Sequence, residues 1–128
     1  MKFLALAAAA SIGLATAVTA ATPPAAVRVL MQRADATTGQ EAVMGQATFP
    51  PGAISDFHTH PGVEMIIVTQ GEVLFKIRGQ ADRVLKAGDS ILAPRGVAHA
   101  AHNTSSGTTV LTNTWLIDKG QPLATPAP

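Results

Sequence analysis

From Val27 onward, apolar residues occur in short runs that are separated by glycine, proline, asparagine, aspartate and serine. No segment keeps the 3.6-residue spacing of an amphipathic helix over three turns, whereas several runs alternate with a period of two. Many short strands with Gly and Pro turns are typical of a sandwich or barrel, so the pattern predicts an all-β fold. We expect strands over Val27–Met31, Glu41–Phe49, Asp56–Thr59, Glu64–Thr69, Val73–Arg78, Arg83–Lys86, Ser90–Ala93, His99–Asn103 and Thr108–Ile117.

The expected strand Glu64–Thr69 has apolar side chains on both of its faces. Ile66 and Val68 share a side with Glu64, while Met65 and Ile67 lie on the opposite side. A strand that is apolar on both sides is expected near the middle of a sheet. We expect Met65 and Ile67 to cover a second sheet or a dimer partner.

The N-terminal segment has the pattern of an export signal. Lys2 is followed by an uncharged stretch, residues 3–21, and two prolines come soon afterwards. We expect a signal peptide over residues 1–20, cleaved after Ala20 with Ala21 as the near alternative. A membrane anchor is the other interpretation, but it needs about 20 strongly apolar residues, and much of this stretch is Ala, Thr, Ser or Gly. The mature chain is therefore expected in the periplasm or outside the cell, without a stable membrane anchor.

Length and composition then limit the chemistry. The chain has 128 residues, enough for one domain, which we expect over residues 21–119. Residues 120–128 hold three prolines and no charge, so we expect a flexible tail. A net charge of +1 without a basic run makes nucleic acid an unsuitable partner. Because Cys and Tyr are absent, disulfides, thiolate ligands and phenol acids are excluded, and four histidines and eight carboxylates hold most of the available chemistry.

Three histidines and a glutamate form the most specific pattern. His58 and His60 are two positions apart, so in an extended strand both imidazoles project to the same side, about 6.6–6.8 Å apart along the chain. A Pro-Gly pair then predicts a turn that returns Glu64 to this side, and His99 follows a later turn. Three neutral imidazoles and one carboxylate can hold a divalent ion, and an ion that prefers six ligands keeps two positions free.

At these residues the sequence resembles the cupins. The first cupin motif, Gly-x5-His-x-His-x3-Glu-x6-Gly, is matched by Gly52, His58, His60, Glu64 and Gly71. The second, Gly-x5-Pro-x-Gly-x2-His-x3-Asn, is matched by Gly88, Pro94, Gly96, His99 and Asn103. The resemblance implies a single cupin-type β-barrel, a double-stranded β-helix or jelly roll, often a homodimer. It also implies one metal ion inside the barrel, bound by His58, His60, Glu64 and His99.

Three further residues have open roles. Asp56 lies in phase with His58 and His60, so it could orient a ligand imidazole or act as a base; a solvated turn carboxylate is the alternative. Arg95 could guide an anionic substrate at the barrel mouth, or be a solvated turn residue. His102 is out of phase with the ligands, which favours a surface position or one behind them.

The leading functional hypothesis is a metal-dependent, dioxygenase-like enzyme acting on a small oxygenated substrate such as an enediol, flavonol or diketone. The side chains available for catalysis, Asp56 and Glu64, are few, which favours chemistry driven by substrate chelation to the ion. The ion is one of Fe, Mn, Ni, Cu or Zn. Two alternatives stay open: a non-catalytic protein that binds or senses a small molecule, and a metal-assisted isomerase or lyase acting on a sugar acid with Asp56 as its base.

Overall fold

The computed structural model describes residues 21–128; the expected signal peptide lies outside these residues. The described residues form strands and no helix, so no helix among them could span a membrane. The all-β expectation is confirmed. In chain order the strands are β1 (Val27–Thr37), β2 (Gln40–Phe49), β3 (Ile54–Thr59), β4 (Gly62–Gln70), β5 (Glu72–Ile77), β6 (Arg83–Lys86), β7 (Ser90–Ala93), β8 (His99–His102), β9 (Thr109–Asp118) and β10 (Thr125–Pro126).

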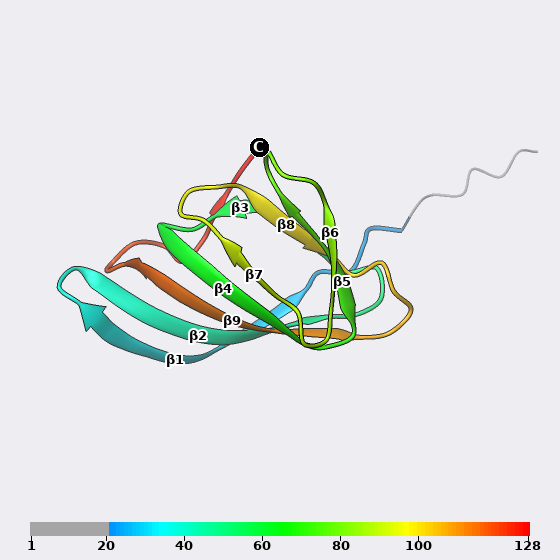
Figure 1. Ribbon diagram of the computed structural model, residues 1–128, viewed down its shortest axis with the longest axis horizontal. Coiled ribbons are helices and arrows are strands. Elements are labelled where there is room, and N and C mark those ends of the chain that lie inside the picture. Colours follow the sequence, from blue (N-terminus) through cyan, green and yellow to red (C-terminus); the bar gives the residue numbers. More distant parts are fainter. Residues whose placement is uncertain (1–20) are drawn as a thin grey trace, which may run out of the picture.

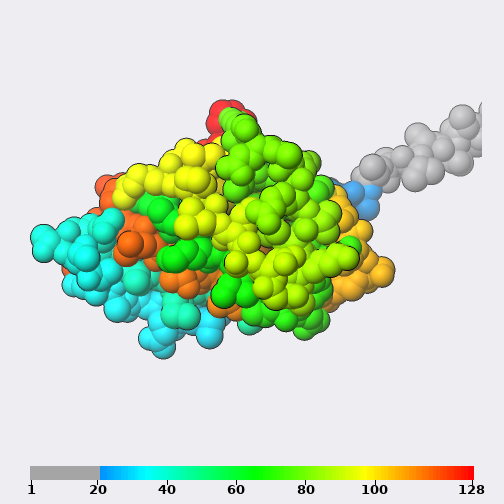
Figure 2. Space-filling model, viewed as in Figure 1, coloured from blue at the N-terminus to red at the C-terminus, as the bar shows by residue number. Residues whose placement is uncertain are grey.

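The strands form two antiparallel sheets that face each other (Figure 1). The first sheet has the order β1-β2-β9-β4-β7, and the second has the order β10-β3-β8-β5-β6. Neighbours in each sheet are mostly distant in sequence, because the chain crosses repeatedly from one sheet to the other. β1 and β2 extend past the second sheet on the left of Figure 1, and they project from the body in Figure 2.

The core lies between the sheets and follows the period-two pattern. Alternate residues of β2, β4, β5 and β9 are buried, as expected for sheets with one face toward a core. β4 has partners on both sides, which confirms its central position. The outward side chains of Met65 and Ile67 are 40% and 51% exposed within the single chain.

The step from β3 to β4 depends on close packing against β9. A Cβ atom placed on Gly62 would lie 1.9 Å from the main-chain oxygen of Leu116, so no side chain fits there. Glycine thus lets β4 begin directly against β9, in the register that pairs Glu64 with Trp115. This register brings Glu64 to the inner face.

β1 is much longer than the pattern predicts. We expected a strand over Val27–Met31, but it continues to Thr37, and all of its residues are exposed. Its pairing with β2 is interrupted by two irregularities and ends at a turn that contains Gly39, whose φ is 82°. Main-chain hydrogen bonds to β2 hold this strand in place. Hydrophobic periodicity reveals buried strand faces, so it does not detect an exposed strand that is held by main-chain pairing alone.

The tail was expected to be flexible, but it adds a short strand to the second sheet. Thr125 pairs with Thr59, and Pro126 pairs with His58. Pro126 is tolerated because β10 is an edge strand, where a missing N–H leaves no inner ladder bond unmade. Leu123 packs against the cluster that contains Trp115. The tail therefore covers the end of the core next to β3.

Candidate metal centre

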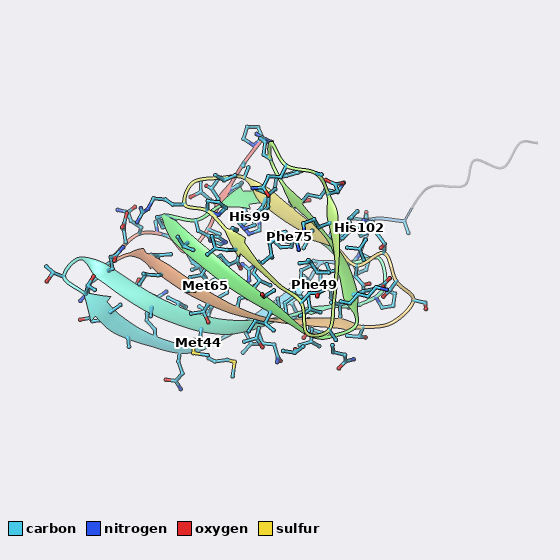
Figure 3. The ribbon with its side chains drawn as sticks, viewed as in Figure 1. Met44, Phe49, Met65, Phe75, His99 and His102 are labelled. Atoms are coloured by element: carbon cyan, nitrogen blue, oxygen red, sulfur yellow. The ribbon has the colours of Figure 1, made fainter. Side chains whose placement is uncertain are left out.

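The four candidate ligands come from three strands and the turn between two of them. His58 lies on β3, His60 follows it, Glu64 lies on β4, and His99 begins β8. The register pairs His58 directly with His99 in the second sheet, while Glu64 reaches the site from the first sheet. One potential ligand atom from each of the four side chains lies within 4.8 Å of the others. Figure 3 shows His99 pointing into the space between the sheets.

All three imidazoles are held by the main chain through the same nitrogen. Each Nδ1 lies within hydrogen-bond distance of a carbonyl oxygen: 2.7 Å from His58 to Asp56, 2.9 Å from His99 to Val97 and 2.5 Å from His60 to Leu123. A carbonyl oxygen can only accept, so each Nδ1–H donates. This arrangement turns the Nε2 lone pairs of all three rings toward the site, as is usual for metal-binding histidines. The lone pair of His60 Nε2 also lies 3.2 Å from Trp115 Nε1.

The Nε2 atoms and the Glu64 carboxylate have converging lone pairs. Glu64 Oε2 lies 3.1 Å from His60 Nε2 and 2.9 Å from His99 Nε2. His58 Nε2 is buried and has no hydrogen-bond partner among the described residues. Acceptor atoms this close to one another need a positive charge between them, either a proton or a metal ion. Nitrogen and carboxylate ligands suit a divalent transition metal, so the donor set fits such an ion.

The electrostatics of Glu64 agree with a cation-binding role. Burial alone would raise its pKa, but hydrogen bonds and positive charge from His60 and His99 together lower the pKa far below the usual value. Burial lowers the pKa of His58, an effect opposed by its bond to the Asp56 carbonyl. The carboxylate is thus kept ionised and His58 is favoured in its neutral, ligating form.

Two residues hydrogen-bonded to the ligands were not assigned a role at the metal site from the sequence, where Trp115 was expected only to fill the core or a pocket wall. Asn113 Nδ2 donates to Glu64 Oε1 at 2.8 Å, which leaves Oε2 facing the imidazoles. Trp115 is fully buried, and its Nε1–H donates to His60 Nε2 at 3.2 Å; an ion bound by this nitrogen takes the place of that hydrogen bond. Both lie on the inner face of β9. A polar residue at an inward position of an alternating strand, as at Asn113, is the signal that could have identified it.

The space beside the ligands is small and mostly apolar. Phe75 stacks on the imidazole of His99, with 5.9 Å between ring centroids and 18° between planes. Phe49, Ile66 and Leu111 line the same cavity. The volume inside this cavity that is open to the centre of a water molecule is about 10 Å³, which is enough for about one water molecule or ion.

Asp56 does not point toward the ligands, contrary to its expected phase. Ser55 pairs with Ala101 and His58 pairs with His99, so three steps along β3 match two along β8. This bulge reverses the alternation, and Ser55 lines the cavity instead. Asp56 is exposed and borders a hollow on the outer face of the second sheet. Its carbonyl oxygen orients His58, whereas its carboxylate lies elsewhere.

The other two residues with open roles also lie outside the ligand cluster. Arg95 makes a two-pronged ion pair with Asp118, with distances of 2.7 and 2.8 Å, at the exposed surface. The pair raises the pKa of Arg95 and lowers that of Asp118. His102 is half-buried and borders the outer hollow with Asp56 and Lys76. The expectation that His102 does not ligate agrees with this position.

Comparison with known families agrees with the two sheets and the ligand cluster. The family described as "Cupin domain" matches residues 45–116, more than half of the chain. The chain belongs to the cupin family. The fold is accordingly the cupin double-stranded β-helix expected from its motifs.

Curated relatives share part of this cupin domain. "Oxalate oxidase 2" of Hordeum vulgare is 38% identical over 68 residues, which cover 47% of this chain and 30% of that protein. An uncharacterized protein, YdbB, of Bacillus subtilis is 44% identical over 45 residues, or 34% of this chain and 40% of that protein. The match thus spans about a third of the length of these relatives.

Solved structures show the same fold. A protein with a double-stranded β-helix domain from Klebsiella pneumoniae has a TM-score of 0.67 at 22% identity, covering 79% of this chain and 85% of that one. A recombinant oxalate oxidase in complex with glycolate has a TM-score of 0.67 at 24% identity, covering 82% of this cupin and 56% of the oxidase. At these identities the likeness concerns the fold.

Proposed function

We propose that this cupin binds one divalent transition-metal ion, Fe, Mn, Ni, Cu or Zn, through His58, His60, Glu64 and His99. The observation that carries the proposal is the shared orientation of the three imidazoles. Each uses Nδ1 for a main-chain carbonyl, and the Nε2 atoms of His60 and His99 lie within 3.1 Å of Glu64 Oε2. Within residues 21–128, His58 Nε2 is buried without a partner. An orphaned buried nitrogen is costly unless something binds it.

We further propose that the chain is a dioxygenase-like enzyme acting on a small oxygenated substrate. When bound, such an ion supplies Lewis-acid polarisation of a chelating substrate and redox chemistry with O₂. The protein orients Glu64 through Asn113 and surrounds the ligand set with apolar walls that exclude water. Support also comes from the partial relatives that are named oxalate oxidases.

The size of the cavity favours small substrates. With room for about one water molecule beside the ligands, an enediol or diketone of a few atoms requires less movement of the walls than a flavonol does. Among the proposed substrates we therefore favour the smallest.

The position of Asp56 weakens the isomerase or lyase alternative. That mechanism needs a base beside the substrate, but the Asp56 carboxylate lies on the outer face. Among the described residues, Glu64 is the one carboxylate that lines the cavity, and two imidazoles and Asn113 already engage it.

A non-catalytic binding protein is the second candidate. It is favoured by the cavity itself, which offers no acid or base among the described residues beyond the candidate ligands. Such a protein would hold a small oxygenated molecule unchanged.

Oxygen consumption by the metal-loaded protein separates the two. Samples loaded with each of the five metals are incubated with an enediol, a diketone or a flavonol, and O₂ uptake and product are measured. An enzyme consumes O₂ with at least one substrate and loses this activity in a His58→Ala variant. Uptake with none of them, together with tight retention of an unchanged ligand, favours the binding protein.

We also propose that the chain is exported, by virtue of the signal-like pattern of residues 1–20. Mass spectrometry of the protein recovered from its native cell envelope or medium tests this. A mature N-terminus at Ala21 supports cleavage after Ala20, and a full-length chain retained inside the cell contradicts export.

A further inference from the structure

One arginine reaches the metal cavity from the strand outside the core. Arg28 lies on β1 opposite the buried Ala47 of β2, so it belongs to the inner face of the first sheet. It lines the same cavity as His58 and Glu64. Its guanidinium carbon lies 5.4 Å from the centroid of the Trp115 ring, a cation–π contact. Arg28 is exposed, so it places a positive charge at the outer edge of the cavity that His58 and Glu64 also line.

The charge of Arg28 has no carboxylate partner among residues 21–128. The next two charged residues of β1 are paired, because Arg33 lies 3.5 Å from Glu41 and Asp35 lies 2.8 Å from Lys119. Arg28 makes no ion pair or hydrogen bond with the described residues, although guanidinium has five N–H donors in a planar fork. Because Arg28 is exposed, water can reach these donors, and an anion in the cavity would replace that water with charge-assisted hydrogen bonds.

Asn113 supplies a second unused group in the same cavity. Its Nδ2 donates to Glu64 Oε1, and a carboxylate can only accept, so the amide orientation is fixed. Its Oδ1 is then an acceptor, and it is buried without a partner among the described residues. Asn113 is 2% exposed and lines the cavity with Arg28. A hydroxyl group on a ligand would satisfy Oδ1.

We propose that Arg28 and Asn113 form a subsite for a small hydroxycarboxylate. The guanidinium at the exposed edge of the cavity binds the carboxylate, and Asn113 Oδ1 accepts a hydrogen bond from the hydroxyl. Because the cavity has room for about one water molecule, its walls move apart to admit the ligand. The inference rests on the proposed function insofar as the same ligand lies beside the metal, and it narrows the substrate to a small hydroxy acid. Arg95, the sequence-based candidate for binding an anion, is already engaged by Asp118.

The chain offers a direct optical readout of this subsite. Trp115 is the single tryptophan in the sequence, and Arg28 lies over its ring. An anion that engages the guanidinium changes the surroundings of the indole and hence its fluorescence. Glycolate, acetate and glycolamide are titrated into the zinc-loaded protein and into the metal-free protein. These three ligands differ in the hydroxyl and in the charge.

The subsite predicts a fixed order of affinities. Glycolate binds more tightly than acetate, which lacks the hydroxyl, and at least about tenfold more tightly than neutral glycolamide. Arg28→Gln weakens glycolate binding about tenfold or more, and Arg28→Lys weakens it less because the charge remains. Arg83→Gln, the same change at an exposed position of β6 away from this cavity, leaves binding unchanged. Zinc stoichiometry is equal in all variants.

The results that would contradict the subsite differ from those that would contradict the proposed oxygenase function. Equal glycolate affinity in wild type and Arg28→Gln, or no preference for glycolate over glycolamide, overturns the subsite even if the protein consumes O₂ with a neutral enediol. Loss of glycolate binding in Arg28→Gln supports the subsite even if no substrate is oxidised. If the protein binds no zinc, the same comparison of glycolate affinity between wild type and Arg28→Gln is made with the metal-free proteins and tests the subsite there. Circular dichroism of each variant checks that it is folded.

Discussion

At the scale of single residues, the site is built by main-chain carbonyls that fix side-chain rings. His58, His60 and His99 each donate Nδ1–H to a carbonyl oxygen, so the orientation of their Nε2 atoms follows from backbone geometry. This arrangement limits how far the rings can turn when an ion binds or leaves.

The metal-free protein should lose stability in acid through His58. Burial lowers the pKa of His58 below its usual 6.5, so between the lowered folded value and 6.5 the unfolded chain binds a proton that the folded chain does not. The contribution of neutral His58 is full above pH 6.5 and is lost as the pH falls through this window. We expect the melting temperature of metal-free protein to fall between about pH 7.5 and about pH 5.5, and less steeply in His58→Gln. Equal slopes would contradict this account.

Asn113 should control metal affinity without being a ligand. Its bond to Glu64 Oε1 holds Oε2 toward the imidazoles, and residues that orient ligands commonly contribute about ten- to a hundredfold to affinity. We expect Asn113→Ala to weaken binding of a divalent metal by about this factor, measured by competition with a chelator. Thr112→Ala, on the other face of the same strand, serves as the control. Unchanged affinity in Asn113→Ala would show that this hydrogen bond is dispensable.

At the scale of elements, the tail supports the site through one carbonyl. Leu123 accepts from His60 Nδ1, and β10 is held on β3 by pairing with Thr59 and His58. Deletion of residues 121–128 should weaken metal binding about tenfold or more, because His60 loses the partner that fixes its ring. Deletion of residues 127–128 alone keeps Leu123 and β10 and should have a smaller effect. Calorimetric titration with metal measures both, and equal affinities would contradict a role for the tail.

The strand elements also explain what the sequence could and could not predict. The spacing of His58, His60 and Glu64 predicted their convergence, because period-two alternation and a short turn determine it locally. The bulge in β3 that turns Asp56 outward depends on pairing with β8, which the sequence of β3 alone does not reveal. The partner of His60 lies 63 residues away in the tail, beyond any local rule. Long-range pairing therefore determines the positioning residues and brings His99 beside His58, while local spacing brings His58, His60 and Glu64 together.

At the scale of the whole molecule, the first sheet presents an apolar outer face. Met44, Met65 and Leu92 lie in one row across β2, β4 and β7, aligned through Thr114 of β9. They are 41%, 40% and 52% exposed in the single chain. Figure 3 shows Met44 on the outside of this sheet. Such a row is typical of a surface that a partner covers.

The expected homodimer stays a prediction, and we propose that this row lies in its interface. Light scattering after size-exclusion chromatography should give twice the mass of one chain. Met65→Lys should shift the protein toward monomer, because it places a charge in an apolar interface. Val84→Lys, at a similarly exposed position of the second sheet, should not. A monomeric wild-type protein would contradict the prediction.

Metal content tests the central claim most directly. The protein is purified from its native compartment and its metal-to-protein ratio is measured by elemental analysis, alongside His99→Ala and the control His102→Ala. Convergence of three imidazoles and Glu64 on one ion predicts a ratio of about one divalent transition metal per chain in the wild type and in His102→Ala, and a strongly reduced ratio in His99→Ala. A wild-type protein without such a metal, or an undiminished ratio in His99→Ala, would contradict it.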